Sequence, residues 1–471
     1  MTVVHPTPPP RSPLGRAYAE QASWSTPAGH PTAATTPAGH PTAAARDSAT
    51  LTLAYRGRFL DGPAFLSGTE RRAVARDLRT IHDLLRTLPE RAFGGSLAAL
   101  ADAVGMTPRQ TALITRSART GSLVPLGRAD LYHDGSGFRL LEFNITSALG
   151  GFENADVNRA MLAYPPLRDF VDRHRLRYTD TVAGMVRTMY AECAATIPAD
   201  RPPVVAVLDT VENFAVVGPR LAVLAAKLAD HGVEGIACHP GQLSFPNGRP
   251  TVAGRAVDVV FRYFLAEDLA DPASAAQLEP LLVAVEQGRV GLFSRLDAEV
   301  YGNKGALAML SDDRLRDLFD ADERACVDRI LPWTRYVRPR VTDPGGTGVD
   351  VLRYARSRQD ELVLKPTLLH GGSGIVAGWQ VTGAEWEARV GAAVDGPFVL
   401  QHRVRPAAEP FPDGTGGVRD HYLNWGIYLG DHAVVGADGY AGCFLRGSTE
   451  PTVGVVSLGD GALVGCAFHD D

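Results

Sequence analysis

Cysteine is scarce in this 471-residue chain, and the way the few cysteines are spaced excludes two classes of protein. Five are present, an odd number, and they lie far apart in the sequence. This pattern fits neither a disulfide framework nor a zinc site. We therefore expect reduced thiols that only pack in the interior, namely Cys193, Cys238, Cys326, Cys443 and Cys466.

Long apolar runs and long basic runs are missing as well. No apolar stretch approaches the roughly 20 residues that a membrane helix needs. The formal net charge of −6 gives no field that would attract nucleic acid. Prolines also interrupt the N-terminus, where a secretory signal needs an unbroken apolar stretch. The sequence predicts a cytoplasmic protein with small-molecule partners, no nucleic acid and no membrane, and it leaves the oligomeric state open.

The chain is too long for one hydrophobic core, so we expect two or three packed units. Residues 1–48 are rich in Pro, Ala and Thr and contain a near-duplicate, TPAGHPTAAT at 26–35 and TPAGHPTAA at 36–44. Such a segment buries too little apolar surface to offset its ordering entropy. We predict a disordered leader in which His30 and His40 are solvated and do not bind a metal.

Two helical segments follow the leader. Apolar residues recur at helical spacing from Ser67 to Leu88, after a cap at Ser67 or Thr69, which predicts one long amphipathic helix. Residues 97–114 predict two short helices around a glycine turn, which superficially resembles a helix-turn-helix DNA reader. Because Arg109 is the only base in that segment and the chain is acidic, an ordinary helical hairpin is the preferred interpretation.

Strand and helix patterns alternate from about 203 to 300, with apolar strands at 204–209, 235–239 and 257–264 and a helix near 217–231. This alternation predicts a parallel sheet with a possible site at the strand ends. Asn213 and Arg262 lie near such ends, so either is a candidate substrate contact. A structural salt bridge for Arg262 is an equally good interpretation.

Beyond residue 300 the pattern changes again, to helices at 304–311 and 313–330 and then mainly to strands. The strands are expected at 361–365, 397–401 and 424–429, with many glycines between them. A mixed antiparallel domain is the simplest interpretation.

The sharpest local feature is a hairpin at 128–144, where two alternating segments flank DGSG. If Gly135 to Gly137 form the loop, Asp130 lies opposite Glu142 and Arg128 lies opposite Asn144. Alternation then places these four side chains on one face of the sheet. The other face carries the apolar residues Ala129, Leu131, Leu141 and Phe143.

Two carboxylates opposed on a sheet repel each other, and a fold retains such a pair mainly when something positive lies between them. A magnesium ion fits, because it takes hard oxygen ligands and commonly one or two carboxylates. Asp130, Glu142 and Asn144 are thus candidate metal ligands, and Arg128 could neutralise a bound phosphate or carboxylate. The alternative is an exposed face on which Arg128 bridges both acids, and a slip of one residue would reverse the faces.

Candidate phosphate-binding elements follow further along the chain. Lys365 ends an apolar strand and precedes a glycine-rich loop, which suits phosphate although the order differs from a Walker motif and a plain surface turn is possible. Asn303 and Lys304 open a helix, Gln401 ends a strand that could border adenine, and Arg446 ends another. The loop residues are Gly371, Gly372, Ser373 and Gly374.

In this order the motifs resemble the circularly permuted ATP-grasp ligases, and most of all the synthetase domain of the glutathionylspermidine synthase family. That family has an arginine, an aspartate two residues later and a Glu-x-Asn about a dozen residues on, as Arg128, Asp130, Glu142 and Asn144 stand here. Its Asn-Lys helix start, Lys-Pro strand with glycine loop, hinge glutamine and late arginine are similar to Asn303-Lys304, Lys365-Pro366 with Gly371 to Gly374, Gln401 and Arg446. The resemblance covers roughly residues 125–471.

The resemblance implies an α/β and α+β protein with a circularly permuted ATP-grasp fold, a preceding Rossmann-like α/β unit and an N-terminal helical region. The implied domains are the leader at 1–48, helices and the metal-binding hairpin at 49–200, an α/β substrate domain at 201–300 and the nucleotide-binding domain at 301–471.

The implied activity is ATP-dependent and Mg²⁺-dependent ligation of a carboxylate to an amine of the amino acid, peptide or polyamine type. The reaction would pass through an acyl phosphate, and synthesis of a peptide-like natural product is one setting. Lys304, Lys365, the glycine loop, Gln401 and Arg446 would bind ATP. Two other functions stay open, a phosphotransferase that forms no amide and an ATP-responsive DNA-binding regulator.

Overall fold

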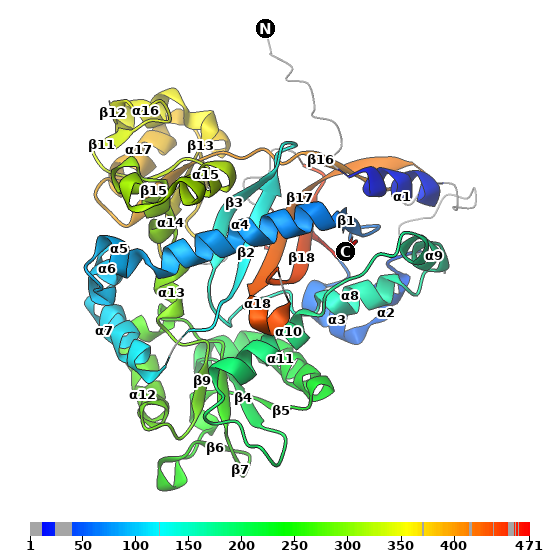
Figure 1. Ribbon diagram of the computed structural model, residues 1–471, viewed down its shortest axis with the longest axis vertical. Helices are drawn as coiled ribbons and strands as arrows, with labels where there is room; N and C mark the ends of the chain where they lie inside the picture. The colour runs from blue at the N-terminus through cyan, green and yellow to red at the C-terminus, as the bar shows by residue number, and fades with distance from the viewer. Residues whose placement is uncertain are drawn as a thin grey trace.

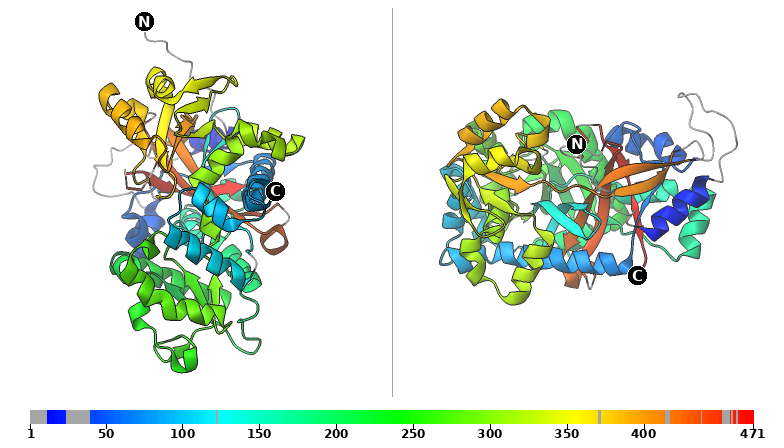
Figure 2. Two further views of the ribbon diagram at one scale, coloured as in Figure 1. Left: turned by 90° about the vertical axis from the view of Figure 1, so that its left-hand side faces the viewer. Right: turned by 90° about the horizontal axis from the view of Figure 1, so that it is seen from above.

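The computed structural model describes residues 12–23, 40–121, 123–369, 372–413, 417–436, 438–450, 456, 458–459 and 461–471. Three larger sheets follow one another along the long axis of the molecule (Figure 1). An antiparallel four-stranded sheet lies at one end, a six-stranded sheet in the middle, and a parallel four-stranded sheet at the other end (Figures 1 and 2). The mixed α/β class expected from the sequence is confirmed.

The central sheet has the order β19-β18-β17-β2-β3, with β16 paired to β17, and all of its pairs are antiparallel. It joins a hairpin from the first third of the chain to strands from the last quarter. Its strands are β2 (Leu126–His133), β3 (Phe138–Asn144), β16 (Ala408–Pro412), β17 (Val418–Gly430), β18 (Tyr440–Ser448) and β19 (Leu463–Gly465).

The long amphipathic helix expected from the sequence is α4 (Gly68–Arg86), which begins with a capping box between Ser67 and Glu70. Its apolar side packs on one face of the central sheet, across β2, β3 and β17 (Figure 1). Leu78 and Ile81 of the helix share a core with Leu131 and Phe143 of the hairpin. With one face covered, the polar residues of these strands face the other side.

The register of the hairpin is as predicted at the far end and differs near the turn. Asp130 pairs with Glu142, but Leu131 pairs with Leu140, so a β-bulge falls at Leu141. The bulge turns the side chain of Leu141 to the polar face, while Leu140 is buried in the core. The prediction that Leu141 belongs to the apolar face is therefore wrong.

The parallel sheet predicted between 203 and 300 is confirmed, with the order β5-β4-β8-β9. Two helices contribute to the core on one face and a third helix to the core on the other. The elements are β4 (Val204–Leu208), β5 (Glu234–Cys238), β8 (Val259–Arg262), β9 (Gly291–Phe293), α10 (Thr181–Glu192), α11 (Val211–Leu228) and α12 (Pro272–Glu286), with a small hairpin of β6 (Thr251–Val252) and β7 (Arg255–Ala256).

The third sheet has the order β10-β15-β13-β14, and the helices α16 and α17 share its core. We call this part the small lobe. The helix predicted at 313–330 is divided, because Asp320 caps a new helix at Ala321. The elements of the small lobe are β10 (Thr334–Tyr336), β13 (Leu362–Pro366), β14 (Val376–Ala377), β15 (Phe398–His402), β11 (Arg340–Thr342), β12 (Gly348–Asp350), α16 (Val351–Ser357) and α17 (Gly383–Ala393). The lobe adjoins α13 (Ala298–Tyr301), α14 (Lys304–Ser311) and α15 (Ala321–Ile330).

The prediction of a disordered leader is wrong for part of residues 1–48. Pro13–Ser23 form α1, in which the ring of Tyr18 lies 5.6 Å from that of Phe65 and 5.3 Å from that of Phe170. The aromatic contacts supply the apolar burial that composition alone does not reveal. His40 lies 3.6 Å from Asp61. Residues 1–11 and 24–39, including His30, lie outside the described residues.

Short helices and two paired strands complete the fold. The hairpin predicted at 97–114 is confirmed as a pair of helices, and Arg116 on the second of them forms ion pairs with Glu279 and Glu286 on α12. The elements are α2 (Ala43–Asp47), α3 (Ala49–Tyr55), α5 (Leu88–Ala92), α6 (Leu97–Ala103), α7 (Pro108–Ser117), α8 (Asn154–Met161), α9 (Pro165–Arg173), α18 (His432–Val435), β1 (Ala64–Leu66) and β20 (Ala467–His469).

Two expectations from composition can be compared with the structure. All five cysteines are buried and free, as expected. Among the helices of the described residues, none combines the length and apolar character that crossing a membrane requires.

The carboxyl group of Glu192, at the end of α10, is largely enclosed by the protein. Its burial leads to a prediction about stability. Its Oε2 is buried and has no hydrogen-bond partner among the described residues, and Oε1 accepts a 3.4 Å hydrogen bond from the Arg295 amide. Burial raises the pKa of Glu192 from 4.5 to about 8, although Arg295 acts against the shift. The folded protein therefore holds more protons than the unfolded chain between these pH values, so this carboxyl makes folding less favourable as pH rises.

Glu192→Gln should raise the free energy of unfolding at pH 8 and change it little at pH 5, because the amide has no proton to lose. The gain should grow by at most about 1.4 kcal/mol per pH unit. Urea unfolding at several pH values measures it. Glu212→Gln, at an exposed position on α11, is the control that should show no such trend. A gain independent of pH would contradict the account.

Candidate active site

The polar face of the central sheet gathers polar and charged side chains from four neighbouring strands, β3, β2, β17 and β18. Asp130 lies opposite Glu142, and Arg128 lies opposite Asn144, as the sequence predicted. On the other side of β2, Asn424 of β17 pairs with Arg446 of β18. Residues from two distant parts of the chain therefore form one surface.

Two arginines bind Asp130, which is 3% exposed. Arg128 Nε lies 3.0 Å from Asp130 Oδ1, and Arg446 Nη2 lies 2.8 Å from the same oxygen. Arg446 also donates a 2.9 Å hydrogen bond to Asn424 Oδ1. Although burial alone would lower the pKa of Arg128, Asp130 raises it above its usual range. Asp130 therefore holds both guanidinium groups in place.

A glycine makes room for this arrangement. Gly426 lies opposite Asp130 on β17. A Cβ atom at this position would lie 2.8 Å from the carbonyl oxygen of Phe444 and 3.1 Å from Cδ of Arg128. Any larger residue would push the arginine away from Asp130.

Two lysines approach Glu142 from other elements. Lys304 Nζ, at the start of α14, lies 3.4 Å from Glu142 Oε2 and donates a 2.7 Å hydrogen bond to the Leu369 carbonyl. Lys365 Nζ, on β13, donates to Gln401 Oε1 at 2.6 Å and to the Leu141 carbonyl at 3.2 Å.

The pKa values of this cluster follow from burial and charge. Burial lowers the pKa of Lys365 to about 8, against the attraction of Glu142. Burial alone would raise the pKa of Glu142, but Lys304 and Lys365 outweigh it and hold that pKa well below its usual range. Glu142 therefore stays ionised, as a metal-binding or cation-binding carboxylate must.

The cluster carries more positive than negative charge. Four cations, Arg128, Arg446, Lys304 and Lys365, surround the two carboxylates Asp130 and Glu142, and each of the four is close to nine-tenths buried or more. Buried charge of one sign is costly unless a partner neutralises it. An anion that carries several charges, such as a polyphosphate, would do so.

The donor set also fits a magnesium ion that arrives with such an anion. No group of three or more His, Cys, Asp or Glu suited to a metal occurs in the described part of the chain. Magnesium bound with a nucleotide needs only one or two carboxylates, because phosphate and water supply the other ligands. Asp130 and Glu142 with the amide of Asn144, which donates a 3.3 Å hydrogen bond to Glu142, meet that need.

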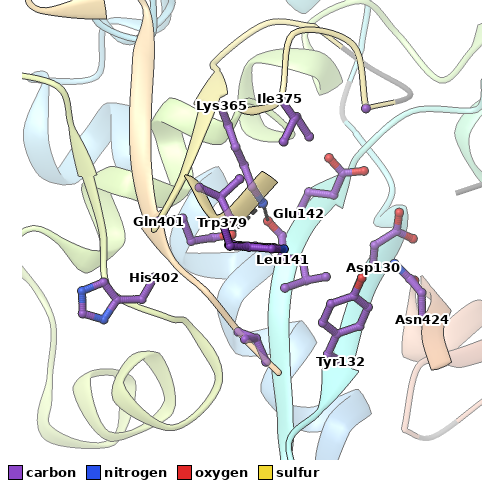
Figure 3. Close-up of a pocket in the computed structure, with 13 residues that line it drawn as sticks. Asp130, Tyr132, Leu141, Glu142, Lys365, Ile375, Trp379, Gln401, His402 and Asn424 are labelled. Atoms are coloured by element: carbon purple, nitrogen blue, oxygen red, sulfur yellow. Dashed lines mark hydrogen bonds between the residues drawn. The ribbon is translucent and has the colours of Figure 1, made fainter. Parts of the chain in front are cut away.

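A cavity between β3 and the small lobe adjoins this cluster (Figure 3). The polar group of Lys365 with Gln401 lies on one side, and Asp130, Glu142 and Asn424 lie on another (Figure 3). Gln401 is itself held by a 3.1 Å hydrogen bond from its amide to Thr334. The apolar part of the cavity lining consists of Tyr132, Leu141, Val363, Ile375, Trp379 and Val404.

A second cavity of about 310 Å³ lies beside the first. Arg128, Arg220, Phe444 and Arg446 line it. Three residues, Asp130, Glu142 and Gly372, line both cavities. The two carboxylates therefore lie where a ligand in one cavity would meet a ligand in the other.

The predicted glycine loop is only partly described. Gly372 has φ of +84° and Gly374 has φ of +70°, values that favour glycine. Gly372 reaches both cavities, whereas Ser373 is exposed. Gly371 lies outside the described residues.

Arg262 does not belong to this site, so the prediction that it contacts substrate is wrong. Its side chain is fully buried and forms an ion pair with Glu299. It also donates hydrogen bonds to the Ser294 carbonyl at 2.6 Å and to Thr146 Oγ1 at 3.1 Å. The structural salt bridge is the correct alternative.

Asn213 lines neither of the two cavities. It donates to Asp209 Oδ1 at 3.2 Å and to Asp268 Oδ1 at 3.1 Å, near the start of α11. Its contact with a substrate stays a prediction.

Sequence reasoning missed several residues of the site. Arg220 lies in the second cavity and binds Glu153 through two contacts of 2.9 and 3.0 Å. A single arginine after a proline within an apolar helix was a usable signal. Trp379 lines the first cavity beneath Arg403, whose Cζ lies 3.7 Å from the ring centroid. Nothing in the local sequence distinguishes Trp379 or Asn424 from ordinary core residues.

Comparisons with known proteins identify the fold. No family model and no curated protein matches the sequence. A glutathione synthetase-like effector from Globodera pallida matches with a TM-score of 0.50 and 11% identity, over 88% of this chain and 90% of that chain. A protein provisionally described as a gamma-glutamylcysteine synthetase from Methylobacillus flagellatus matches with a TM-score of 0.41 and 13% identity, over 86% and 89%.

The comparison of folds rests on the first of these structures. The chain is a mixed α/β protein whose fold is similar, over most of its length, to that of a glutathione synthetase-like protein. This similarity concerns the fold alone, and it agrees with the resemblance expected from the sequence.

Asp130→Asn should destabilise the ligand-free protein, because it leaves Arg128 and Arg446 buried without a carboxylate. Breaking a buried pair costs roughly 3 to 5 kcal/mol. We expect a loss of about 3 kcal/mol in the free energy of unfolding, measured in urea. The matched control is Asp77→Asn on α4, whose partner Arg329 is more than half exposed. That change should cost about 1 kcal/mol or less, and equal losses in the two variants would contradict the assignment.

Proposed function

We propose that this protein is an ATP-dependent carboxylate-amine ligase that forms an amide through an acyl phosphate. The observation that carries the proposal is the cluster of four buried cations around two opposed carboxylates, at the boundary between two cavities. At such a boundary, a ligand in one cavity can transfer a phosphoryl group to a ligand in the other. The fold similarity to a glutathione synthetase-like protein agrees with it.

The nucleotide would occupy the cavity lined by Lys365 and Trp379. Aromatic and aliphatic side chains there suit a base, and the amide of Gln401 is held rigidly at its edge. Lys304 and Lys365 would bind the phosphates, which replace Glu142 as their counter-charge. The backbone of Gly372 would approach the terminal phosphate.

Asp130, Glu142 and Asn144 would hold magnesium. When bound, the metal neutralises charge on the phosphates and aligns the transferred group. Arg128 and Arg446 are already oriented by Asp130, so they need no rearrangement to contact the transferred group.

The carboxylate substrate would occupy the second cavity, beside Arg128. Its oxygen attacks the γ-phosphorus, the bond from that phosphorus to the bridging oxygen of ATP breaks, and ADP leaves. Arg128 and Arg446 stabilise the resulting acyl phosphate. The amine then attacks the acyl carbon, phosphate leaves, and an amide remains after loss of a proton. Amino acids, short peptides and polyamines are the substrate types to test.

The direct test is a screen of amino acids, peptides and polyamines in pairs for release of ADP. We expect ADP to accumulate only when a carboxylate and an amine are both present, with one amide and one phosphate formed per ADP. A stable phosphorylated product formed without an amine would show that the protein is a phosphotransferase.

Glu142→Ala should reduce ADP formation by at least a thousandfold, because both the metal and the two lysines lose this carboxylate. The measurement is the turnover number with the best substrate pair, together with circular dichroism to verify the fold. Asp77→Asn, which lies outside both cavities, should retain turnover within about twofold. Near-normal turnover of Glu142→Ala would refute the assignment of the metal site.

A further inference from the structure

A separate pocket on the small lobe is rich in arginine and has no part in the proposed function. It has a volume of about 160 Å³ and is formed between β10, β11 and the residues that follow α14. Arg314, Arg335, Arg338 and Arg340 line it, and we call it the arginine pocket. The only acidic residue in its described lining is Asp312, so the lining carries a net charge of about +3, in a chain whose net charge is −6.

The arginines are incompletely neutralised. Arg314 lies 2.6 Å from Asp312. Arg338 lies 3.5 Å from Asp395, a long contact between side chains that are both more than a third exposed. Arg340 donates a 3.0 Å hydrogen bond to the Gly348 carbonyl, and no carboxylate within 4.0 Å of it occurs among the described residues. Exposed pairs of this kind hold arginines in position at little energetic cost and leave them available to an anion.

Arg335 is the buried member and anchors the base of the pocket. It is 6% exposed, and its Nη2 lies 2.8 Å from Asp313. Its Nε is buried and has no hydrogen-bond partner in the described part of the chain. Its Nη1 donates a 2.7 Å hydrogen bond to Ser311 Oγ and a 3.0 Å hydrogen bond to the Thr334 carbonyl, so the guanidinium is fixed at the base of the pocket.

The arginine pocket is separate from the nucleotide cavity, and the two share no lining residue among those described. Thr334 accepts the hydrogen bond from Gln401, so its side chain faces the nucleotide cavity. Arg335 is the next residue of β10, and successive side chains of a strand point to opposite faces. An anion held by Arg335 would therefore not overlap a nucleotide beside Gln401.

We propose that the arginine pocket binds a compact phosphate-bearing anion. Guanidinium groups bind phosphate through two parallel hydrogen bonds, and several of them converging on a concave site favour a compact group with more than one charge. Inorganic phosphate and pyrophosphate carry this chemistry, and so does the phosphate end of a small metabolite. The acidic net charge of the chain disfavours an extended nucleic acid.

The test is a titration of the full-length protein with pyrophosphate at 0.15 M salt, followed by hydrogen exchange of the backbone. Protection should appear in residues 334–342 and saturate with one dissociation constant. It should persist in Lys365→Met, which weakens phosphate binding in the nucleotide cavity. The outcome is thus independent of whether the protein is a ligase.

Arg338→Gln combined with Arg340→Gln should weaken this binding at least tenfold. Both side chains are exposed, so the fold should be retained. The matched control is Arg356→Gln combined with Arg389→Gln, two exposed arginines of α16 and α17 that pair with Glu387 and Glu385. This control should bind pyrophosphate within twofold of the unchanged protein.

Three results would overturn the proposal. The first is a lack of protection in residues 334–342 at millimolar pyrophosphate. The second is an equal loss of affinity in the two double variants, which would indicate general attraction by the lobe and not a site. The third is binding of citrate as tight as that of pyrophosphate, which would assign the pocket to polycarboxylates.

Discussion

Repulsion between Asp130 and Glu142 is the constraint on which the rest of the site depends. The hairpin places these carboxylates directly opposite each other, and a ligand-free protein tolerates the pair only because four cations flank it. The cations exceed the carboxylates in number, so the cluster is balanced fully only when an anion is added. The arrangement of charges therefore suits a nucleoside triphosphate together with its metal ion.

The fold brings these charges together from distant parts of the chain. One hairpin supplies Arg128, Asp130 and Glu142, and a strand some three hundred residues later supplies Arg446. Lys304 lies at the start of α14, which adjoins the small lobe, and Lys365 lies on β13 within that lobe. Helix α4 covers the apolar face of the central sheet and thereby fixes which side chains face the cavities. Two cavities that share Asp130, Glu142 and Gly372 adjoin the cluster, one on each side.

The sequence predicted the local parts of this site better than the assembled site. The pairing of Asp130 with Glu142 followed from turn composition and alternation, which are short-range effects. The bulge at Leu141 did not, because a bulge depends on how the hairpin packs against its neighbours. Arg262 was ambiguous, since its partner Glu299 lies 37 residues away and only the fold brings the two together.

Long-range packing also explains the other differences. Tyr18 makes α1 part of the fold through contacts with Phe65 and Phe170, which no local composition rule can anticipate. Asn424 enters the site because its strand crosses it, and its own sequence neighbours are ordinary in pattern. The parallel sheet and the long helix α4 were predictable, since periodicity alone specifies them.

The central claim is that the charge cluster binds a nucleotide together with its metal. Calorimetric titration with the β,γ-imido analogue of ATP, with and without magnesium, tests this most directly because it requires no knowledge of the other substrates. The account predicts one site per chain and binding at least tenfold tighter with magnesium, with that gain lost in Glu142→Ala. Absence of binding, or an affinity that does not change with magnesium, would contradict it.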